Sequence, residues 1–316
     1  MQNDKLERFK TLTEEFLLQQ DETPDSVIKK LQNLKKLEKQ EAVYVLNYIA
    51  GMEQNPKILS AIVKEMGKYR DQSSVQVLIN LLTGFKENRD QYLDVRITTA
   101  TTLGNMKDES AIVPLMYVMN DKEESYRLRL WAADALGKIG NSQAVVPLIR
   151  IVSDEEEKSV YLKESAAKAL GMIGDERAVD SLIDILETQK GMVDKFNYLK
   201  EKAIEALGRL THKKDKRIQA LKNVLHDESP HVRSSAIEAL SEVDDESITS
   251  LIELMMYDDN EGVAKTAVCA LFYREGKDYI VSLLRRDDLP AVCRNEIMEL
   301  LEEEQDEDEE DEDYPE

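Results

Sequence analysis

Few side chains in this chain of 316 residues are suited to catalysis or metal binding. Its histidines and cysteines are His212, His226, His231, Cys269 and Cys293. A metal site needs several ligands at suitable spacing, and neither cysteine lies near the histidines in the sequence. The sequence also contains no HExxH, CxxC, P-loop, GxSxG or GxGxxG motif. We therefore expect no catalytic residues, no metal and no cofactor, and a non-enzymatic role is favoured over an enzymatic one.

Four tyrosines near the starts of successive predicted helices are candidates for binding a protein partner. They are Tyr92, Tyr126, Tyr161 and Tyr198. Tyrosine is enriched among the residues that dominate protein interfaces, so an aromatic ridge along one edge would suit a partner. The other interpretation is structural, with each ring covering the start of its helix as in a hydrophobic staple. The sequence favours the structural interpretation and leaves the ridge open.

The chain is strongly acidic, with 42 Lys and Arg against 64 Asp and Glu and a formal net charge of −22. Phosphate backbones attract clustered Lys and Arg, so we expect no nucleic-acid partner. Residues 302–316 are almost all Asp or Glu and carry −12, which leaves −10 for the rest of the chain. Such a block repels itself and predicts a disordered tail. The tail either keeps the protein soluble or attracts a basic partner.

The elements that would position these residues belong to an internal repeat. Similar segments begin at Ile58, Val95, Leu128, Leu162, Leu199, Val232 and Val263. Each carries an A-L-G-like core followed, after a short break, by a second apolar stretch. The glycine position recurs every 31–37 residues, at Gly67, Gly104, Gly137, Gly171, Gly208, Ser241 and Phe272. A repeat of this length predicts one helical hairpin per copy, stacked on its neighbours.

Both helices of each copy show an apolar stripe at helical spacing. In the fourth copy the first helix carries Leu162, Ala166, Ala169, Leu170 and Ile173. The alanines let neighbouring helices approach closely, so successive copies can stack at a regular spacing. The second helix of the preceding copy carries its own stripe, at Val145, Leu148, Ile149 and Val152. Stacked hairpins share one continuous core, which predicts an all-α protein, an α-solenoid with the form of a right-handed superhelix.

The repeats resemble those of the HEAT family, in particular the short type found in phycobilisome lyases (PBS lyase HEAT-like repeats). The residues that carry the resemblance are the A-A-x-A-L-G-x-I-G cores at 132–140 and 166–174, with A-V-x-P-L at 144–148 and A-V-x-S-L at 178–182. The resemblance implies the fold and says little about function, because the repeat is widely used as a binding platform. The helical-repeat di-iron hydroxylases use His-Glu pairs, which this sequence lacks.

The resemblance also implies a ladder of ion pairs between repeats. Its basic members lie eight residues before the glycine position, at Arg96, Arg129, Lys163, Lys200 and Arg233. Its acidic members end several second helices, at Asp121, Asp154, Asp227 and Asp258. Exposed pairs contribute about 0–1 kcal/mol each, so we expect the ladder to set the register of the stack.

The domain organisation follows from the extent of the repeats. We expect residues 1–57 to form three helices that cap the solenoid. Residues 58–301 hold about seven HEAT-like repeats and a C-terminal cap. Residues 302–316 form the acidic tail.

A second candidate binding surface is a row of residues flanking the central buried leucine of each second helix, hereafter the second-helix stripe. It comprises Val113, Tyr117, Val146, Arg150, Asp180, Asp184, Gln219, Asn223, Thr249 and Glu253. We expect the second helices to line the concave surface. The stripe changes along the chain from apolar and aromatic to acidic and polar, so a partner would need a matching gradient. The alternative is a row of residues that only contact solvent.

The favoured function is a scaffold, adaptor or assembly factor that binds another protein on the concave face. One alternative, implied by the resemblance alone, is a bilin lyase or isomerase-type subunit that acts on a phycobiliprotein. Another is a chaperone-like handler of a basic protein, since an acidic chain suits a partner with a basic surface. The chain has no signal-peptide core and no apolar run of 18 residues, so we expect a cytoplasmic protein without membrane contact.

The repeat pattern makes a first testable prediction about stability. Leu170 lies on the apolar stripe of its helix, so Leu170→Ala should lower the free energy of unfolding by about 2–5 kcal/mol, as for buried leucines in general. Urea titration followed by circular dichroism measures the change. A loss below about 1 kcal/mol would show that the stripe has been placed on the wrong face of the helix.

Overall fold

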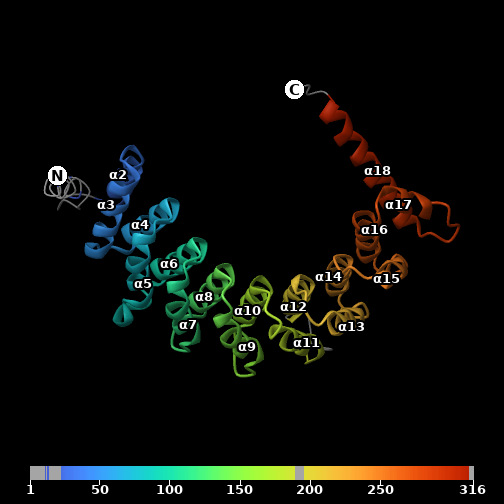
Figure 1. Ribbon diagram of the computed structural model, residues 1–316, viewed down its shortest axis with the longest axis horizontal. Helices are drawn as coiled ribbons and strands as arrows, with labels where there is room; N and C mark the ends of the chain where they lie inside the picture. The colour runs from blue at the N-terminus through green and yellow to red at the C-terminus, as the bar shows by residue number, and fades with distance from the viewer. Residues whose placement is uncertain (1–10, 12, 14–22, 189–195, 313–316) are drawn as a thin grey trace. The chain divides into compact units, whose positions relative to one another are not determined.

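The computed structural model describes residues 11, 13, 23–188 and 196–312, and these residues contain helices and no strand. The chain divides into two compact units, residues 1–173 and 174–316, which are described separately. Each unit is a stack of antiparallel helical hairpins (Figure 1). The predicted all-α solenoid is confirmed.

The described part of unit 1 contains α2 and α3, which both pack on α4, then three helical hairpins and one more helix. The helices are α2 (Pro24–Leu31), α3 (Lys39–Met52), α4 (Pro56–Tyr69), α5 (Val75–Thr83), α6 (Leu93–Met106), α7 (Ile112–Asn120), α8 (Tyr126–Ile139), α9 (Val145–Ser153) and α10 (Val160–Ile173). Short 3-10 turns lie at Gln32–Lys36, Gln72–Ser74, Lys86–Asn88, Glu109–Ala111 and Ser142–Ala144.

Unit 2 continues the same alternation of longer first helices and shorter second helices. Its helices are α11 (Ala178–Thr188), α12 (Asn197–Arg209), α13 (Lys214–Val224), α14 (Pro230–Ser241), α15 (Ser247–Met255), α16 (Glu261–Glu275), α17 (Lys277–Leu283) and α18 (Ala291–Glu312). The first helices of the repeats are therefore α4, α6, α8 and α10 in unit 1, and α12, α14 and α16 in unit 2.

The predicted apolar stripes form the core. Leu162, Ala166, Ala169 and Leu170 of α10 are completely buried, as are Val145 and Leu148 of α9. Between these positions Lys168 of α10 and Val146 of α9 are exposed, while Ala167 is buried as well. Burial of one stripe therefore requires both the partner helix of its own hairpin and the helices of the next hairpin, which is why the hairpins stack.

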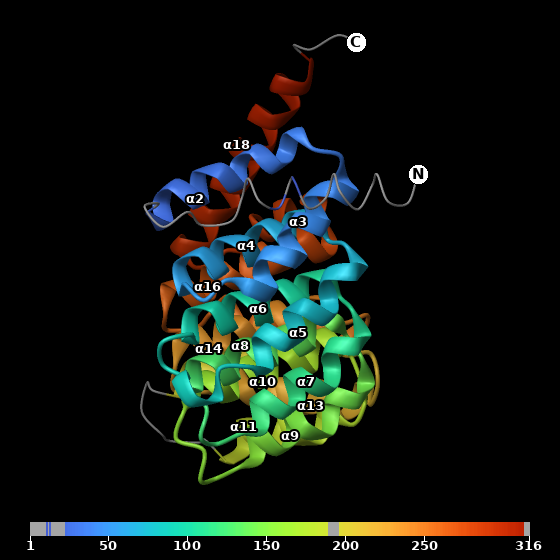
Figure 2. The same cartoon turned by 90° about the vertical axis from the view of Figure 1, so that its left-hand side faces the viewer.

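The first helices pack directly on one another, much more extensively than the second helices do. Figure 2 shows α2, α4 and α6 stacked in this way. The contact is made at backbone distance: a Cβ built on Gly104 would lie 2.7 Å from Cα of Ala135, and one on Gly137 would lie 2.7 Å from Cα of Ala169. Glycine and alanine at this position therefore set the spacing of the stack.

This close packing decides which helices face inward. The row of helices with the shorter spacing must follow the inner side of a bend. In Figure 1 the row α4, α6, α8, α10 lies on the inner side of unit 1, and α5, α7, α9 lie on the outer side. The same arrangement is found within unit 2, with α12, α14 and α16 inside. The prediction that second helices line the concave surface is wrong, because it ignored how closely the glycines and alanines let first helices approach.

The turns after the first helices use the left-handed backbone conformation at one recurring position. Gly140 and Gly174 adopt it after α8 and α10, with φ of 80° and 77°. Arg70 and Lys107 adopt it after α4 and α6, with φ of 45° and 56°. Glycine tolerates this conformation without steric cost, whereas a residue with a Cβ does not.

The chain ends differ from expectation in one respect. Most of the first predicted helix lies outside the described residues. The second and third predicted helices correspond to α2 with its following 3-10 turn and to α3, and α2 packs on α4. Disorder was predicted from residue 302, but helix α18 continues to Glu312. Glutamate is a good helix former, and the helix extends from a first turn that packs on α16, so no new nucleus is needed. Residues 313–316 lie outside the described part.

Among the described residues, no helix combines the length and the apolar character needed to cross a bilayer.

The glycine contacts predict opposite outcomes for two Gly→Ala substitutions. Gly137→Ala should lower the free energy of unfolding by about 1–3 kcal/mol, because the new methyl group overlaps the α10 backbone. Gly51 lies in α3 with no atom within 4 Å of a built Cβ. Gly51→Ala should raise the free energy by up to about 1 kcal/mol through helix propensity. Urea unfolding of both variants provides the comparison. Equal effects of the two substitutions would contradict backbone-distance packing at Gly137.

Candidate functional site

Buried ion pairs connect successive repeats and hold the first helices in place. Arg96, the fourth residue of α6, donates from Nε to the Leu82 carbonyl at 2.8 Å and from its two terminal nitrogens to Glu124 at 2.8 and 2.7 Å. Arg129, at the same position of α8, donates to the Met119 carbonyl at 2.8 Å and pairs with Glu157 at 2.8 Å. Each arginine thus ties the preceding second helix to the loop before the next first helix.

Four of the five predicted basic members, Arg96, Arg129, Lys200 and Arg233, form ion pairs between repeats, with a correction in unit 1. There the acidic members are Glu124 and Glu157. Asp121 and Asp154 instead pair with Arg89 at 3.4 Å and with Lys122 at 2.8 Å. The sequence suggested the aspartates because they end the second helices, but the buried arginines reach three residues further along the loop.

In unit 2 the ladder follows the prediction. Lys200 contacts Asp227 at 2.7 Å, and Arg233 binds Asp258 through two hydrogen bonds of 2.8 and 2.6 Å. These hydrogen bonds lower the pKa of Asp258 despite its burial.

The four tyrosines do not form one class. Tyr92 is only 7% exposed, stacks on Phe85 at 3.8 Å between ring centroids, and donates a hydrogen bond to the Gln54 carbonyl at 2.7 Å. It is a packing residue, and its inclusion in an aromatic ridge is wrong. Tyr126, Tyr161 and Tyr198 are exposed at the starts of α8, α10 and α12. Lys202 lies over the Tyr198 ring at 5.2 Å.

The second-helix stripe lies on the outer side of each unit. Val113 and Tyr117 of α7 are 64% and 52% exposed, and Lys86 lies over the Tyr117 ring at 5.3 Å. Val146 and Arg150 of α9 are also exposed.

The polar members of the stripe in unit 2 contact other side chains of the protein. Asp180 accepts from Lys213 and Lys216, which lowers its pKa, and Asp184 is exposed. Gln219 bonds to Asn223 at 3.0 Å. Thr249 contacts Glu275 and Arg274, and Glu253 accepts from Tyr279 and Arg286. The stripe is on the surface as predicted, but its predicted place on a concave face is wrong.

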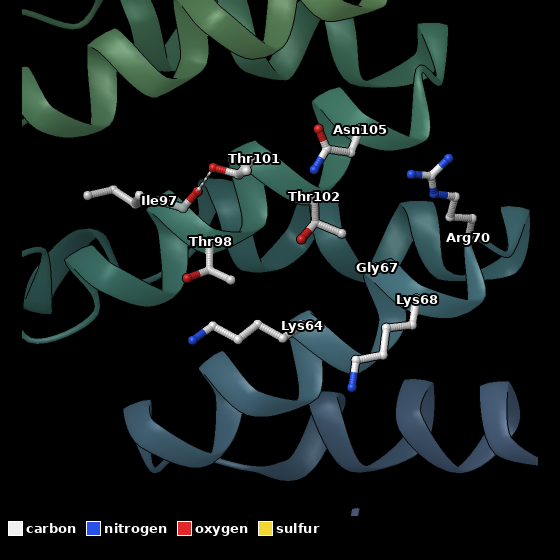
Figure 3. Close-up of a pocket in the computed structure, with 9 residues that line it drawn as sticks. All are labelled: Lys64, Gly67, Lys68, Arg70, Ile97, Thr98, Thr101, Thr102 and Asn105. Atoms are coloured by element: carbon white, nitrogen blue, oxygen red, sulfur yellow. Dashed lines mark hydrogen bonds between the residues drawn. The ribbon is translucent and has the colours of Figure 1, made fainter. Parts of the chain in front are cut away.

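The inner side of unit 1 contains a groove between α4 and α6, hereafter the α4/α6 groove, with a volume of about 800 Å³. Figure 3 shows its lining residues. They are Lys64, Gly67, Lys68, Arg70, Ile97, Thr98, Thr101, Thr102 and Asn105. At Gly67 the helices are close, since a Cβ built there would lie 3.3 Å from Cγ2 of Thr102. The lining contains three cations and no acidic side chain, in a chain whose net charge is −22.

Unit 2 has a groove at the corresponding place, between α12 and α14, with a volume of about 500 Å³. Four glutamates line it together with two cations, at Glu201, Glu205, Glu238, Glu242, Lys202 and Arg209. Burial raises the pKa of Glu201. Glu205 accepts from both Lys202 and Arg209, so the remaining glutamates give this groove an acidic character. The two grooves therefore occupy the same face of the repeat and differ in charge.

No catalytic cluster accompanies the grooves. Within the described part of the chain, no group of three or more His, Cys, Asp or Glu side chains is arranged to hold a metal ion. Cys293 is buried and its thiol donates to the Met256 carbonyl at 3.3 Å, while Cys269 contacts Glu296 at 3.5 Å. Burial, with a contribution from Glu296, raises the pKa of each thiol to about 11.

A family model of HEAT repeats matches the sequence over residues 86–162, 122–194 and 188–271, which together cover more than half of the chain. The chain belongs to the HEAT-repeat family. The recognition of HEAT-like repeats from the A-L-G cores is thereby confirmed, and of the two helices that line the α4/α6 groove, α6 lies within the matched residues and α4 precedes them.

Several solved structures are similar to the chain at low identity. The CpcE–CpcF complex of phycocyanin lyase from Nostoc sp. PCC7120 is 22% identical, with a TM-score of 0.49, over 72% of this chain and 88% of that one. Human deoxyhypusine hydroxylase is 18% identical, with a TM-score of 0.32, over 88% and 96%. The YibA protein of Escherichia coli is 16% identical, with a TM-score of 0.48, over 89% and 99%. A comparison with curated protein sequences finds no significant match.

The groove residues were not identified from the sequence, although a signal was present. Lys64, Thr101, Glu205 and Glu238 all lie three residues before the glycine position, on the face of the first helix where neighbouring helices approach closely. Comparing that position across copies would have shown that its charge varies, and that Glu occupies it in the two copies that form the α12/α14 groove.

The thiol environments predict low reactivity of both cysteines. With a pKa of about 11, roughly one thiol in a thousand is ionised at pH 8, and the thiolate is the nucleophile. Iodoacetamide should therefore alkylate Cys269 and Cys293 at least about 100-fold more slowly in the native protein than in urea, where an ordinary thiol pKa is restored. Mass spectrometry of labelled peptides gives both rates. Rapid alkylation of either residue in the native protein would contradict this and make that cysteine a candidate nucleophile.

Proposed function

We propose that the protein is a non-enzymatic scaffold or assembly factor that binds a partner protein on the inner, first-helix face of its repeats. The observation that supports this proposal is the recurrence of a groove on that face, between α4 and α6 and between α12 and α14. In each case two successive repeats contribute the walls. A binding surface shared by neighbouring repeats is the arrangement that stacked hairpins offer to an extended partner.

The two grooves suit different parts of a partner. The α12/α14 groove, with its four glutamates, supports the expectation of a partner with a basic surface. The α4/α6 groove has the opposite charge. A single partner that binds in both grooves would carry one acidic and one basic segment. Electrostatic complementarity would then fix its direction along the chain.

A bilin lyase or isomerase-type subunit remains a prediction based on the type of repeat alone. The name of the similar Nostoc complex is compatible with it. No described cluster of side chains supports a covalent step.

The inner-face proposal predicts that filling at least one of the two grooves weakens partner binding. Thr101→Trp fills the α4/α6 groove and Ser235→Trp fills the α12/α14 groove, while Tyr117→Ala alters only the outer second-helix stripe. Affinity purification with each variant, followed by titration of the partner identified by mass spectrometry, should show a loss of roughly tenfold or more in affinity for at least one groove variant, which corresponds to about 1.4 kcal/mol. Tyr117→Ala should bind like the parent chain. The opposite pattern would overturn the proposal and restore the outer stripe as the binding surface.

A further inference from the structure

The cations of the α4/α6 groove differ in how far their charges are neutralised. Lys68 pairs with Glu65 at 2.6 Å. Within the described part of the chain, the side chains of Lys64 and Arg70 make no ion pair and no hydrogen bond, and both are exposed. Two positive charges therefore face the groove without a protein counter-ion, although the chain offers 64 acidic residues. An anion from outside the chain can supply the negative charge that would neutralise Lys64 and Arg70.

The uncharged threonines that line the groove from α6 restrict which hydrogen bonds a ligand can make. The Thr98 hydroxyl donates to the Asp94 carbonyl at 2.7 Å, and the Thr101 hydroxyl donates to the Ile97 carbonyl at 3.0 Å (Figure 3). Their protons are used inside α6, so toward the groove these oxygens offer lone pairs only. They can accept hydrogen bonds from a ligand's N–H groups and have no proton left for a phosphate oxygen.

The backbone at Arg70 is a further observation. Arg70 occupies the left-handed position that Gly140 and Gly174 occupy in two later copies. An arginine there is less favourable than glycine for the fold. Lys107 adopts the same conformation after α6 and does not line the groove, so this backbone geometry places the Arg70 side chain and does not by itself mark a site.

We propose that the α4/α6 groove binds an acidic, extended peptide segment of the partner protein. Lys64 and Arg70 bind its carboxylates, the Asn105 amide adds a donor and an acceptor, and Thr98 and Thr101 accept its backbone N–H groups. A peptide satisfies both parts of the lining, because it carries donors in its backbone and acceptors in its side chains. This inference rests on the proposed function and specifies the chemistry of the partner at one groove.

The length of the groove limits the segment it holds. Ile97 and Asn105 are eight residues apart on α6, which corresponds to about 12 Å of helix. About four residues of extended chain cover that distance. A short peptide is therefore a sufficient probe.

Fluorescence anisotropy with the full-length chain tests the proposal. The probe is a fluorescein-labelled hexaglutamate peptide with flanking glycines, and the hexaglutamine peptide is its neutral counterpart. The glutamate peptide should bind and the glutamine peptide should not. Binding should weaken as NaCl rises from 50 to 300 mM, because exposed charges are screened. Equal binding of the two peptides would overturn the proposal.

The chain offers a closely matched pair of variants. Lys64→Gln with Arg70→Gly removes both cations and places glycine at a left-handed position. Lys35→Gln with Lys107→Gly makes the same change of charge and relieves the same backbone conformation outside the groove. The first variant should weaken binding of the glutamate peptide about five- to tenfold, as expected for two exposed ion pairs. The second should bind like the parent, and neither should lower the thermal midpoint. An equal loss of affinity in both variants would show that only the net charge of the protein matters, and would overturn the assignment of the peptide to the α4/α6 groove.

Two further measurements exclude other occupants. A single-stranded oligonucleotide of six nucleotides should bind more weakly than the peptide, and tighter binding that depends on Lys64 and Arg70 would overturn the choice of a peptide. Sedimentation velocity of the parent chain should show no self-association that the Lys64→Gln, Arg70→Gly variant abolishes. Such self-association would assign the groove to an acidic segment of a second copy.

The outcome can be separated from that of the proposed function. If Thr101→Trp abolishes partner binding while the glutamate peptide fails to bind, the inner face is the binding surface and only the acidic segment is wrong. If the peptide binds through Lys64 and Arg70 while partner binding ignores both groove variants, the anion site stands and the scaffold proposal fails.

Discussion

Backbone-distance contact between successive first helices is the constraint on which the rest of the structure depends. It exists because the glycine of one copy meets the alanine that lies two residues before the glycine position of the next copy, as at Gly104 against Ala135 and Gly137 against Ala169. The contact fixes the spacing of the hairpins and makes the first-helix row the shorter one. It also leaves shallow space beside the missing side chains, and one groove opens there in each unit. Fold and candidate site thus have a common origin.

The sequence predicted the repeating part of the molecule well, for a physical reason. The apolar stripe of each copy has to be buried by its neighbours. The spacing of Leu162, Ala166 and Leu170 therefore predicts both the helix and the stacking of hairpins. The same alanines also indicate which row of helices is more closely spaced and therefore lies on the inner side of the bend. The prediction did not consider this spacing, so it placed the second-helix stripe on the concave side. Tyr92 is a packing residue, as the favoured interpretation of the sequence had it, but the partner of its hydroxyl is the Gln54 carbonyl, 38 residues earlier, and no local pattern encodes such a contact.

The candidate site was less predictable because it depends on differences between copies. Repetition identifies residues that every copy needs, whereas the positions of Lys64 and Arg70 vary in charge from copy to copy, with Asp134 and Gly140 in the third. Net charge was also misleading as a guide to partners. The net charge of −22 determines the electrostatic potential at a distance from the molecule. A ligand in the α4/α6 groove is instead closest to three cations.

The buried arginines have a consequence for how the stack comes apart. Arg96 and Arg129 each take a carboxylate from the loop that leads into the following first helix. If that next hairpin detached alone, it would leave a desolvated cation behind, so neighbouring hairpins of unit 1 should melt together and resist fraying one by one. Arg294, at the same position of α18, is satisfied by the carbonyls of Leu284 and Arg286 instead. At this rung, backbone oxygens thus take the place of the carboxylate that Arg96 and Arg129 bind.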